Sequence, residues 1–477
     1  MNIASTVLPS TEKPPGPSPH KIFIRCMVPV VFLFFLVSLG RPFVTDDALI
    51  YSMIGEAIYQ KGLMPFTYVF DHKPLFTYYL YGLLAMLAPN DFPKYQIISV
   101  IGYAITAWVT QAFVRKDRWI IHFLILTGLS IQYLRFSGNT ELFFAPLALA
   151  STLLAMRNKS AGYMALAGAL AAIAFNMNYL AFFSIGPSVL YAIFSSEKAR
   201  RLQLVDIAIY AAGFLLTVLL IFAPLYLKDP QLVPAFFAAQ QRFLKGYNAY
   251  TVRPPVFFFL SALPLALLFG FSLPCDQKDR RARNALVIAT VFAFGGAISS
   301  GKFYAYYMYP VVVPLTALFV LSNFARKWLV MLVAMTILMV ASAVIYIKNF
   351  GTLEEARATY DFSQYRKLHD LVGKDDMLSM RAHMEVTYFS DIKPMQPYVW
   401  ENHAELIMGA GEDDYFSRYL AAKPKFVATN TYLCQGDKAE WDLPKSCATL
   451  TENYTRIMNI EDHAYFRRAY IYQRNAS

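Results

Sequence analysis

The chain has 477 residues, of which 57% are hydrophobic and 16% are charged, against about 25% charged in soluble proteins. This composition excludes an ordinary cytosolic enzyme, a disordered chain and a small disulfide-rich secreted module. The net charge of +11 does not by itself indicate nucleic acid, because the inner loops of membrane proteins are basic. The sequence therefore predicts a membrane protein, and the positions of its few charges become the main evidence.

The N-terminal residues 1–21 are rich in proline, serine and threonine, which predicts a solvated tail without a core. An apolar run follows within 22–40, and Arg41-Pro42 ends it. A cleavable secretory signal would place its charge and apolar run nearer the start and end at a small-residue cleavage site. We therefore predict that 22–40 is an uncleaved first transmembrane helix.

Ten further apolar runs predict membrane helices, which makes eleven spans in all. These runs lie near 95–114, 119–134, 142–156, 160–175, 179–194, 202–225, 255–274, 284–299, 307–324 and 328–347. Residues 75–88 are also apolar, but they are too few for a span of about 20 residues and are bounded by prolines. We predict that this segment forms a helix lying in the membrane interface.

Loop charges indicate the orientation of these spans. The proposed inner loops hold 14 Lys and Arg in 26 residues, whereas the outer loops hold 10 in 100. The positive-inside rule then places the N-terminus in the cytoplasm and the C-terminus outside. If 75–88 crossed the membrane, every later loop would invert and the basic clusters would face outward. The charge count thus argues against a twelve-span transporter.

A change in composition at Lys348 marks a separate part of the chain. Residues 348–477 are mixed polar and charged, without an apolar run of membrane length. Apolar periodicity predicts a helix at 353–373, and segments 425–430, 454–460 and 464–472 read as strands. We therefore predict a cytoplasmic tail (1–21), a transmembrane domain (22–347) and a small α/β domain outside the membrane (348–477).

Two of the four cysteines, Cys434 and Cys447, fall in a predicted loop of this last domain. In an oxidising compartment the pair would form a disulfide, the reading that we favour over two buried thiols. Cys26 and Cys275 fall at the inner face and should stay reduced.

Acidic residues of the membrane part concentrate on one side. Asp206 alone lies within a predicted span, near its inner end, whereas an ion-coupled pump needs ionisable groups at mid-membrane depth. The pattern favours chemistry or binding at the outer surface. The seven acids on that face are Asp46, Asp47, Glu56, Asp71, Asp91, Glu141 and Asp229.

Asp46 and Asp47 directly precede a predicted helix, Ala48–Gln60. Carboxylates in that place cap the free N–H groups of the first turn. Two adjacent acids also raise each other's pKa, as a general base requires. Glu141, at the mouth of a span, is a second candidate, or else a solvated loop acid.

Cations on the outer face lie among aromatic residues. Lys73, in Asp71-His72-Lys73-Pro74, precedes the interfacial helix and can neutralise a lipid phosphate, or it can snorkel to the membrane surface. Arg242, Lys245 and Arg253 share the loop 226–254 with Phe and Tyr, a mixture that suits a lipid headgroup or a sugar. Lys302 lies among tyrosines that include Tyr304 and Tyr307; they can stack on a sugar or form an interfacial aromatic belt.

Taken in order, these motifs resemble those of the GT-C superfamily of membrane glycosyltransferases, in the branch of the protein O-mannosyltransferases and the lipid A aminoarabinose transferase. The resemblance covers most of 22–325. Asp46-Asp47 is similar to the acid pair that follows the first span in that family, where the second acid is often Glu. Lys73-Pro74-Leu75 is similar to its Lys-Pro-Pro motif, and Glu141 to an acid of its second outer loop. The segment from Gly301 to Pro310, with Lys302, Tyr304 and Tyr307, is similar to its late Lys/Tyr-Pro segment, while Lys94 is the nearest base to a family arginine.

The resemblance implies a mainly α-helical polytopic protein that moves a sugar from a polyprenyl-phosphate donor to an acceptor at the outer, periplasmic face of a bacterial inner membrane. The acceptor would be an envelope glycan, a lipid such as lipopolysaccharide, or a protein. We expect Asp46, Asp47 and Glu141 to be catalytic. Contacts with the lipid phosphate or sugar are expected for Lys73, His72, Arg253, Lys302, Tyr304, Tyr307, Arg242 and Lys245. We expect no metal cofactor, although the acids have the oxygen ligands that Mg²⁺ or Mn²⁺ prefers, and no nucleic acid partner.

Two other functions remain open from the sequence. A transporter or flippase of a lipid-linked sugar would need charges along a path through the bilayer or paired repeats with broken helices, and the sequence has neither pattern clearly. A membrane-anchored glycan-binding protein would use the C-terminal domain as its working part.

Overall fold

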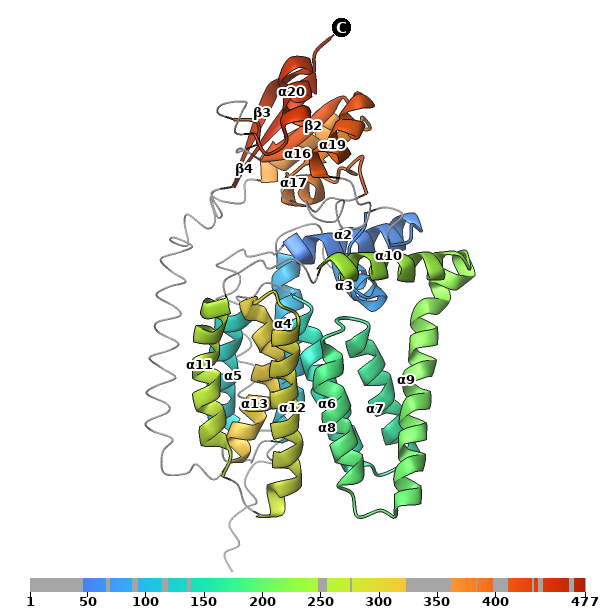
Figure 1. The fold of residues 1–477 in the computed structure, drawn as a ribbon, viewed down its shortest axis with the longest axis vertical. Coiled ribbons are helices and arrows are strands. Elements are labelled where there is room, and N and C mark those ends of the chain that lie inside the picture. The colour runs from blue at the N-terminus through green and yellow to red at the C-terminus, as the bar shows by residue number, and fades with distance from the viewer. Residues whose placement is uncertain are drawn as a thin grey trace, which may run out of the picture.

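The structure is a computed structural model of the chain. It describes residues 46–65, 69–87, 93–113, 119–134, 139–247, 255–274, 277–322, 362–382, 384–397, 411–430, 433–435, 441–462 and 467–476. A bundle of helices has further helices lying across one end, and a small sheet domain lies beyond them (Figure 1). The predicted spans 22–40 and 328–347 and both predicted domain boundaries lie outside the described residues.

The bundle helices follow the apolar runs of the sequence to within a few residues. Among the described residues, α9 and α12 are long and apolar enough to cross a membrane by themselves, so the total of eleven spans stays a prediction. The bundle comprises α4 (Pro93–Gln111), α5 (Trp119–Leu134), α6 (Glu141–Arg157), α7 (Ala161–Phe175), α8 (Ala181–Phe194), α9 (Arg200–Lys228), α11 (Pro255–Ser272), α12 (Arg280–Ser299) and α13 (Tyr309–Leu321).

The outer surfaces of α9 and α11 are apolar. Leu219 and Leu227 of α9 are 67% and 81% exposed, and Leu260 and Leu263 of α11 are similarly open. Monomeric soluble proteins rarely expose contiguous apolar patches of this kind to water. This surface therefore faces lipid, and the chain is a membrane protein.

Small residues let neighbouring helices touch through their backbones. A Cβ atom at Gly168 of α7 would clash with the carbonyl oxygen of Tyr210 in α9, and one at Gly213 would clash with that of Ala165. Such close approach lets helices pack by van der Waals contact where lipid removes the hydrophobic driving force.

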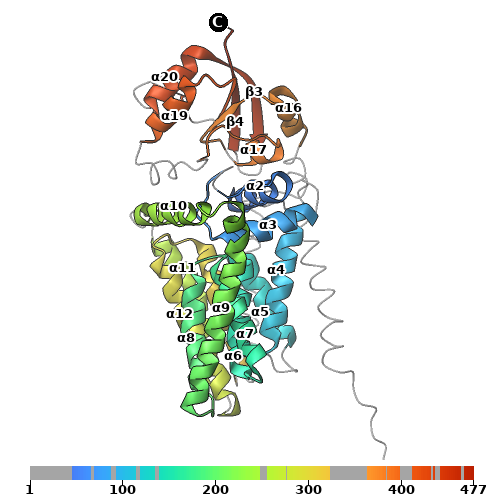
Figure 2. The ribbon, with the colours of Figure 1, turned by 90° about the vertical axis from the view of Figure 1, so that its right-hand side faces the viewer.

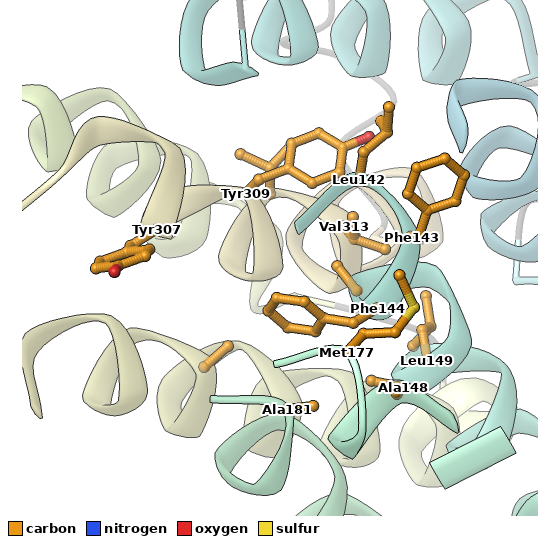
Figure 3. Close-up of a cluster of buried hydrophobic side chains, with 14 of the residues drawn as sticks. Leu142, Phe143, Phe144, Ala148, Leu149, Met177, Ala181, Tyr307, Tyr309 and Val313 are labelled. Carbon is orange, nitrogen blue, oxygen red and sulfur yellow. The ribbon is translucent and has the colours of Figure 1, made fainter. Parts of the chain in front are cut away.

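The centre of the bundle is a packed core between α6, α13 and the turn before α8. Phe144, Met177 and Val313 lie next to one another there, and Tyr307 lies at the edge of the cluster (Figure 3). The Tyr309 hydroxyl donates to Thr106 Oγ1 at 3.3 Å, which ties α13 to α4. Every residue of α13 is buried, so this helix is a rigid base for the segment that precedes it.

Two helices, α2 (Asp46–Lys61) and α10 (Leu232–Tyr247), lie across the end of the bundle from which α6 and α13 begin (Figures 1 and 2). The helix α3 (Leu75–Leu87) packs under α2, where Gly55 and Gly82 meet so closely that a Cβ on either would clash with the other's backbone. The apolar run at 75–88 thus forms a short helix beside α2, as predicted, and its place in the membrane interface stays a prediction.

The prediction of a loop over 226–254 was incomplete, because α10 occupies its middle. Phe236, Gln240 and Phe243 are all buried, and their i, i+4, i+7 spacing gives this helix one inward stripe. Interleaved bases had hidden the helical period in the sequence.

The C-terminal domain has a four-stranded sheet of order β1-β2-β4-β3, in which the β1–β2 pair is parallel and the other two pairs are antiparallel. The strands are β1 (Met377–Met380), β2 (Phe426–Asn430), β3 (Tyr454–Asp462) and β4 (Arg467–Arg474). The last three match the predicted strands, whereas β1 was missed because all four of its residues are buried and show no alternation. The helices are α16 (Phe362–Val372), α17 (Met384–Phe389), α19 (Glu412–Ala421) and α20 (Pro444–Asn453).

A disulfide bond joins Cys434 and Cys447, the pairing that the sequence favoured. The expectation that both lie in a loop is wrong for Cys447, which belongs to α20 and is fully buried. The bond therefore holds this helix to the segment that follows β2.

Candidate active site

Two oppositely charged side chains are buried together at the end of the bundle that α2, α3 and α10 cover. Glu141 is 1% exposed and Lys73 is 6% exposed, and the two attract each other electrostatically. Charged groups are rarely buried to this degree without compensating interactions. This pair defines the candidate site.

Glu141 is the first residue of α6, where the helix dipole favours a carboxylate. The amide of Asn178, from the turn between α7 and α8, donates to Glu141 Oε1 at 3.0 Å. The hydroxyl of Thr140 donates to Oε2 at 3.3 Å. A carboxylate held from two sides in this way is oriented before any ligand arrives.

The segment that carries Lys73 is held by its neighbours. Tyr78 of α3 donates to Asp71 Oδ2 at 3.1 Å, and Gln240 of α10 donates to the carbonyl oxygen of Lys73 at 3.3 Å. His72 stacks on Phe243 of α10 with ring centroids 4.4 Å apart. Lys73 Nζ lies 5.9 Å from the ring centroid of Tyr51, on the underside of α2.

Asp47 lies in the first turn of α2, as predicted, and faces the same site. Asp47 and Glu141 both act electrostatically on the phenols of Tyr51 and Tyr306. Burial and these carboxylates raise the pKa of both phenols well above the usual value, so the phenols stay protonated and can donate a hydrogen bond to a ligand.

The late Lys/Tyr segment reaches the site through η2 (Ala305–Met308). The ring of Tyr304 stacks on that of Tyr306 at 5.1 Å, and Tyr307 meets Tyr306 edge-on at 4.8 Å. Asp47 and Glu141 act electrostatically on the Tyr306 ring of this cluster.

Lys302 is fully buried in the turn between α12 and η2. Gly301 and Phe303 on either side of it have positive φ angles of 64° and 54°, and for a bulky residue such as Phe303 that conformation is strained. Burial lowers the pKa of the Lys302 ammonium. An anion bound beside it would offset this desolvation.

The other predicted site residues are placed less directly. Arg242 and Lys245 are exposed on the face of α10 opposite its buried stripe, so the structure does not bring them to Lys73. Arg253 and the side chains of Asp46 and Lys94 lie outside what the structure describes. The roles predicted for these residues stay predictions.

Four residues of the site were missed as participants by the sequence reasoning: Asp71, Asn178, Tyr51 and Tyr306. Asn178 had a faint signal, since it is one of two asparagines in a three-residue outer loop. For Tyr51 and Tyr306, nothing in the local sequence distinguishes them from the other interfacial tyrosines.

The C-terminal domain contacts the same elements from above. The N–H of Phe70 donates to the carbonyl oxygen of Pro397 at 2.8 Å, next to the Lys73 segment. The hydroxyl of Tyr388 in α17 donates to Glu56 Oε1 of α2 at 2.7 Å. The domain therefore touches both elements that carry Asp47 and Lys73.

Asp46, Asp47 and Glu141 carry the oxygen ligands that a divalent metal ion prefers. Within the residues that the structure describes, no group of three or more His, Cys, Asp or Glu side chains is placed to share one ion. What the described site does offer is a cation beside a lipid-facing bundle, a pair of carboxylates and protonated phenols. Together these groups can bind an anion and accept a proton next to it.

No family model and no curated protein matches the sequence. Among solved structures, the chain is similar to ArnT from Cupriavidus metallidurans bound to undecaprenyl phosphate, with a TM-score of 0.63 and 12% identity over 94% of this chain and 98% of ArnT. The apo form of that ArnT gives a TM-score of 0.60, again at 12% identity, over 95% and 98% of the two chains. The oligosaccharyltransferase of Archaeoglobus fulgidus gives 0.48 at 13% identity, over 92% of this chain and 74% of the other.

At a sequence identity this low, structural similarity is evidence for a shared fold and not for a shared activity. The superpositions on both ArnT structures nevertheless cover nearly the full length of each chain, so they include the C-terminal domain. The resemblance that the motifs predicted is therefore confirmed at the level of the fold, which is similar to that of ArnT.

Proposed function

We propose that this protein is a glycosyltransferase that moves a sugar from a polyprenyl-phosphate donor to an envelope glycan, lipid or protein, at the outer face of a bacterial inner membrane. The observation that carries the proposal is the burial of Lys73 and Glu141, which act on each other electrostatically, together with the electrostatic influence of Asp47 on the same site. The ArnT fold, seen with undecaprenyl phosphate bound, supports a donor of this class.

The proposed location follows from the charges of the loops. The described parts of the inner loops, 157–159, 195–201 and 277–283, are rich in basic residues and lie at the end of the bundle opposite to the site. By the positive-inside rule that end is cytoplasmic. The site and the C-terminal domain are then periplasmic, where a disulfide such as Cys434–Cys447 is stable.

In the proposed reaction an acceptor hydroxyl attacks the anomeric carbon of the donor sugar. The bond from that carbon to the phosphate oxygen breaks, and its electron pair leaves with the polyprenyl phosphate. The proton of the acceptor passes to a carboxylate, Asp46 or Asp47. The products are the glycosylated acceptor and polyprenyl phosphate, with inversion at the anomeric carbon.

Negative charge grows on the leaving phosphate as this bond breaks. Fixed cations in a dry site stabilise such charge strongly, because they need no reorganisation. Lys73 is buried at the foot of α3, and Lys302 is buried in a strained turn. We assign both to the phosphate, with Arg253 as a third cation.

Asp47 and Glu141 are assigned different roles in the reaction. Asp47, in the first turn of α2, is near Glu141 and can accept the proton of the acceptor. Glu141 is held by Asn178 and Thr140, which suits a group that orients the sugar or the acceptor. The stacked Tyr304–Tyr306 rings offer a face on which a sugar can pack.

The direct test is mass spectrometry of envelope glycans from cells with and without this protein. The proposal expects one component to lose the mass of a single sugar when the protein is absent. Unchanged envelope glycans would contradict it. If a lipid-linked sugar instead accumulated on the cytoplasmic side, a flippase would be the better assignment.

A further inference from the structure

The acid that shapes the Lys73 segment is not one of the proposed catalytic acids. We propose that Asp71 is a positioning residue, whose carboxylate holds the backbone of Lys73 so that its ammonium meets the lipid phosphate. The inference rests on the proposed function and adds to it a residue that does not touch the donor.

Asp71 is 5% exposed, and its carboxylate contacts its own segment and Tyr78 of α3. Oδ2 accepts from the Tyr78 hydroxyl at 3.1 Å and from the N–H of Lys73 at 3.3 Å. Oδ1 lies 3.2 Å from His72 Nδ1. A buried carboxylate is costly unless such partners compensate it, so the arrangement has a definite geometry.

The same hydroxyl, which has one proton to donate, lies within hydrogen-bond distance of the backbone on both sides of the carboxylate. Tyr78 Oη lies 2.9 Å from the carbonyl oxygen of Asp71 and 3.1 Å from that of Lys73. Because Tyr78 belongs to α3, it fixes the segment to a rigid element. Gln240 of α10 holds the Lys73 carbonyl from a second helix.

The sequence adds a restriction of its own at this point. Lys73 precedes Pro74, and a residue before proline is kept out of the α region. The Asp71 carboxylate then caps the N–H of Lys73 two residues on, in the pattern of an Asx turn. With its backbone held in this way, Lys73 has its side chain beside Tyr51 and Glu141.

Asp71 therefore acts through Lys73, and this dependence can be measured. The assay is binding of undecaprenyl phosphate to the full-length protein in lipid nanodiscs, followed by native mass spectrometry. The variants are Asp71→Asn, Lys73→Ala and the double variant. Asp229→Asn is the matched control, because Asp229 makes the same turn, to the N–H of Gln231 at 2.9 Å, but is exposed on the outer face.

We expect Asp71→Asn to weaken binding about tenfold or more, since small misplacements of a binding group are costly. Lys73→Ala should weaken it at least as much, and the double variant should bind like Lys73→Ala. Asp229→Asn should bind like the wild type. Tyr78→Phe, which keeps the carboxylate, should weaken binding less and should add little to Asp71→Asn.

Two failures are distinguishable. If Lys73→Ala weakens binding but Asp71→Asn does not, or if Asp71→Asn weakens binding equally in the Lys73→Ala background, the positioning role is wrong and the proposed function stands. If Lys73→Ala leaves binding unchanged, the phosphate role of Lys73 is wrong and the inference falls with it.

Discussion

The two ends of the helical bundle use their charges differently. At the inner end, Lys198 forms a 2.9 Å ion pair with Asp206 and stays about one-third exposed. Arg281 there donates to Ser195 Oγ at 3.0 Å and to the carbonyl oxygen of Ala192 at 2.6 Å. These contacts tie loops to helix ends. Lys198 keeps part of its side chain in water, whereas its partner Asp206 is buried.

At the outer end, the charges of Lys73, Asp71, Glu141 and Lys302 are taken out of water almost completely. Removing an ion from water costs several kcal/mol even in real proteins, and stability alone is a weak reason to keep such groups. The number of basic residues in the loops indicates the orientation of the spans in the membrane. The burial of a few ionisable residues at the outer end indicates where the proposed chemistry takes place. The following variants test that distinction, from the largest expected effect to the smallest.

The carboxylates of the outer end should matter most. Asp47→Asn and Asp46→Asn remove the two candidate bases, and loss of a general base lowers a rate by about 10²–10⁴-fold. Sugar transfer, measured on envelope glycans at equal protein levels, should fall by that amount for the residue that is the base. Transfer at the wild-type rate by both variants would contradict the assignment. Glu141→Gln keeps the shape of the side chain and should also lower transfer.

Removing the charge of Lys302, which is buried in the strained turn, should have the next largest effect on transfer. Lys302→Met keeps the length and the apolar stem of the side chain but removes its charge. If Lys302 stabilises the leaving phosphate, transfer should fall about 10²-fold while the protein folds normally. A variant with full transfer would show that Lys302 serves the turn and not the donor.

The contact between the C-terminal domain and α2 should have a moderate effect. Tyr388→Phe removes the hydrogen bond to Glu56, which is worth about 1 kcal/mol. We expect transfer to fall a few-fold and limited proteolysis between the domains to become faster. This point variant is sharper than deletion of 348–477, because deletion also removes the partner of the Phe70 N–H. Unchanged proteolysis would mean that the contact does not hold the domains together.

The inner end supplies the smallest expected effect. Asp206→Asn breaks an ion pair in which Lys198 is about one-third exposed and Asp206 is buried, so we expect a loss of about 1 kcal/mol of stability. Thermal stability should drop slightly, and transfer should stay at the wild-type level. A large loss of transfer without a loss of protein would show that the two ends of the bundle do not differ in the way described.

Much of the bundle could be predicted from apolar runs, because lipid imposes a minimum length on each span. The candidate acids and lysines could be found because few charges lie on the outer face. The partners of those residues could not be found from the sequence. Asn178 reaches Glu141 from 37 positions away, and Gln240 reaches Lys73 from 167 positions away.

Local patterns also misled at two places. Arg242 and Lys245 share a segment with Gln240 and Phe243, and the helix that forms there turns the bases outward and the other two inward. Among the tyrosines near Lys302, composition carries no information on the influence that Asp47 and Glu141 have on Tyr306.

The most direct test of the account compares one lysine from each end in cells that otherwise lack the protein. Wild type, Lys73→Ala and Lys198→Ala would be expressed at equal levels, and the sugar content of envelope glycans would be measured by mass spectrometry. The account predicts that Lys198→Ala restores the missing sugar as the wild type does and that Lys73→Ala does not. Equal restoration by both variants would contradict the claim that the buried charges at the outer end carry the chemistry.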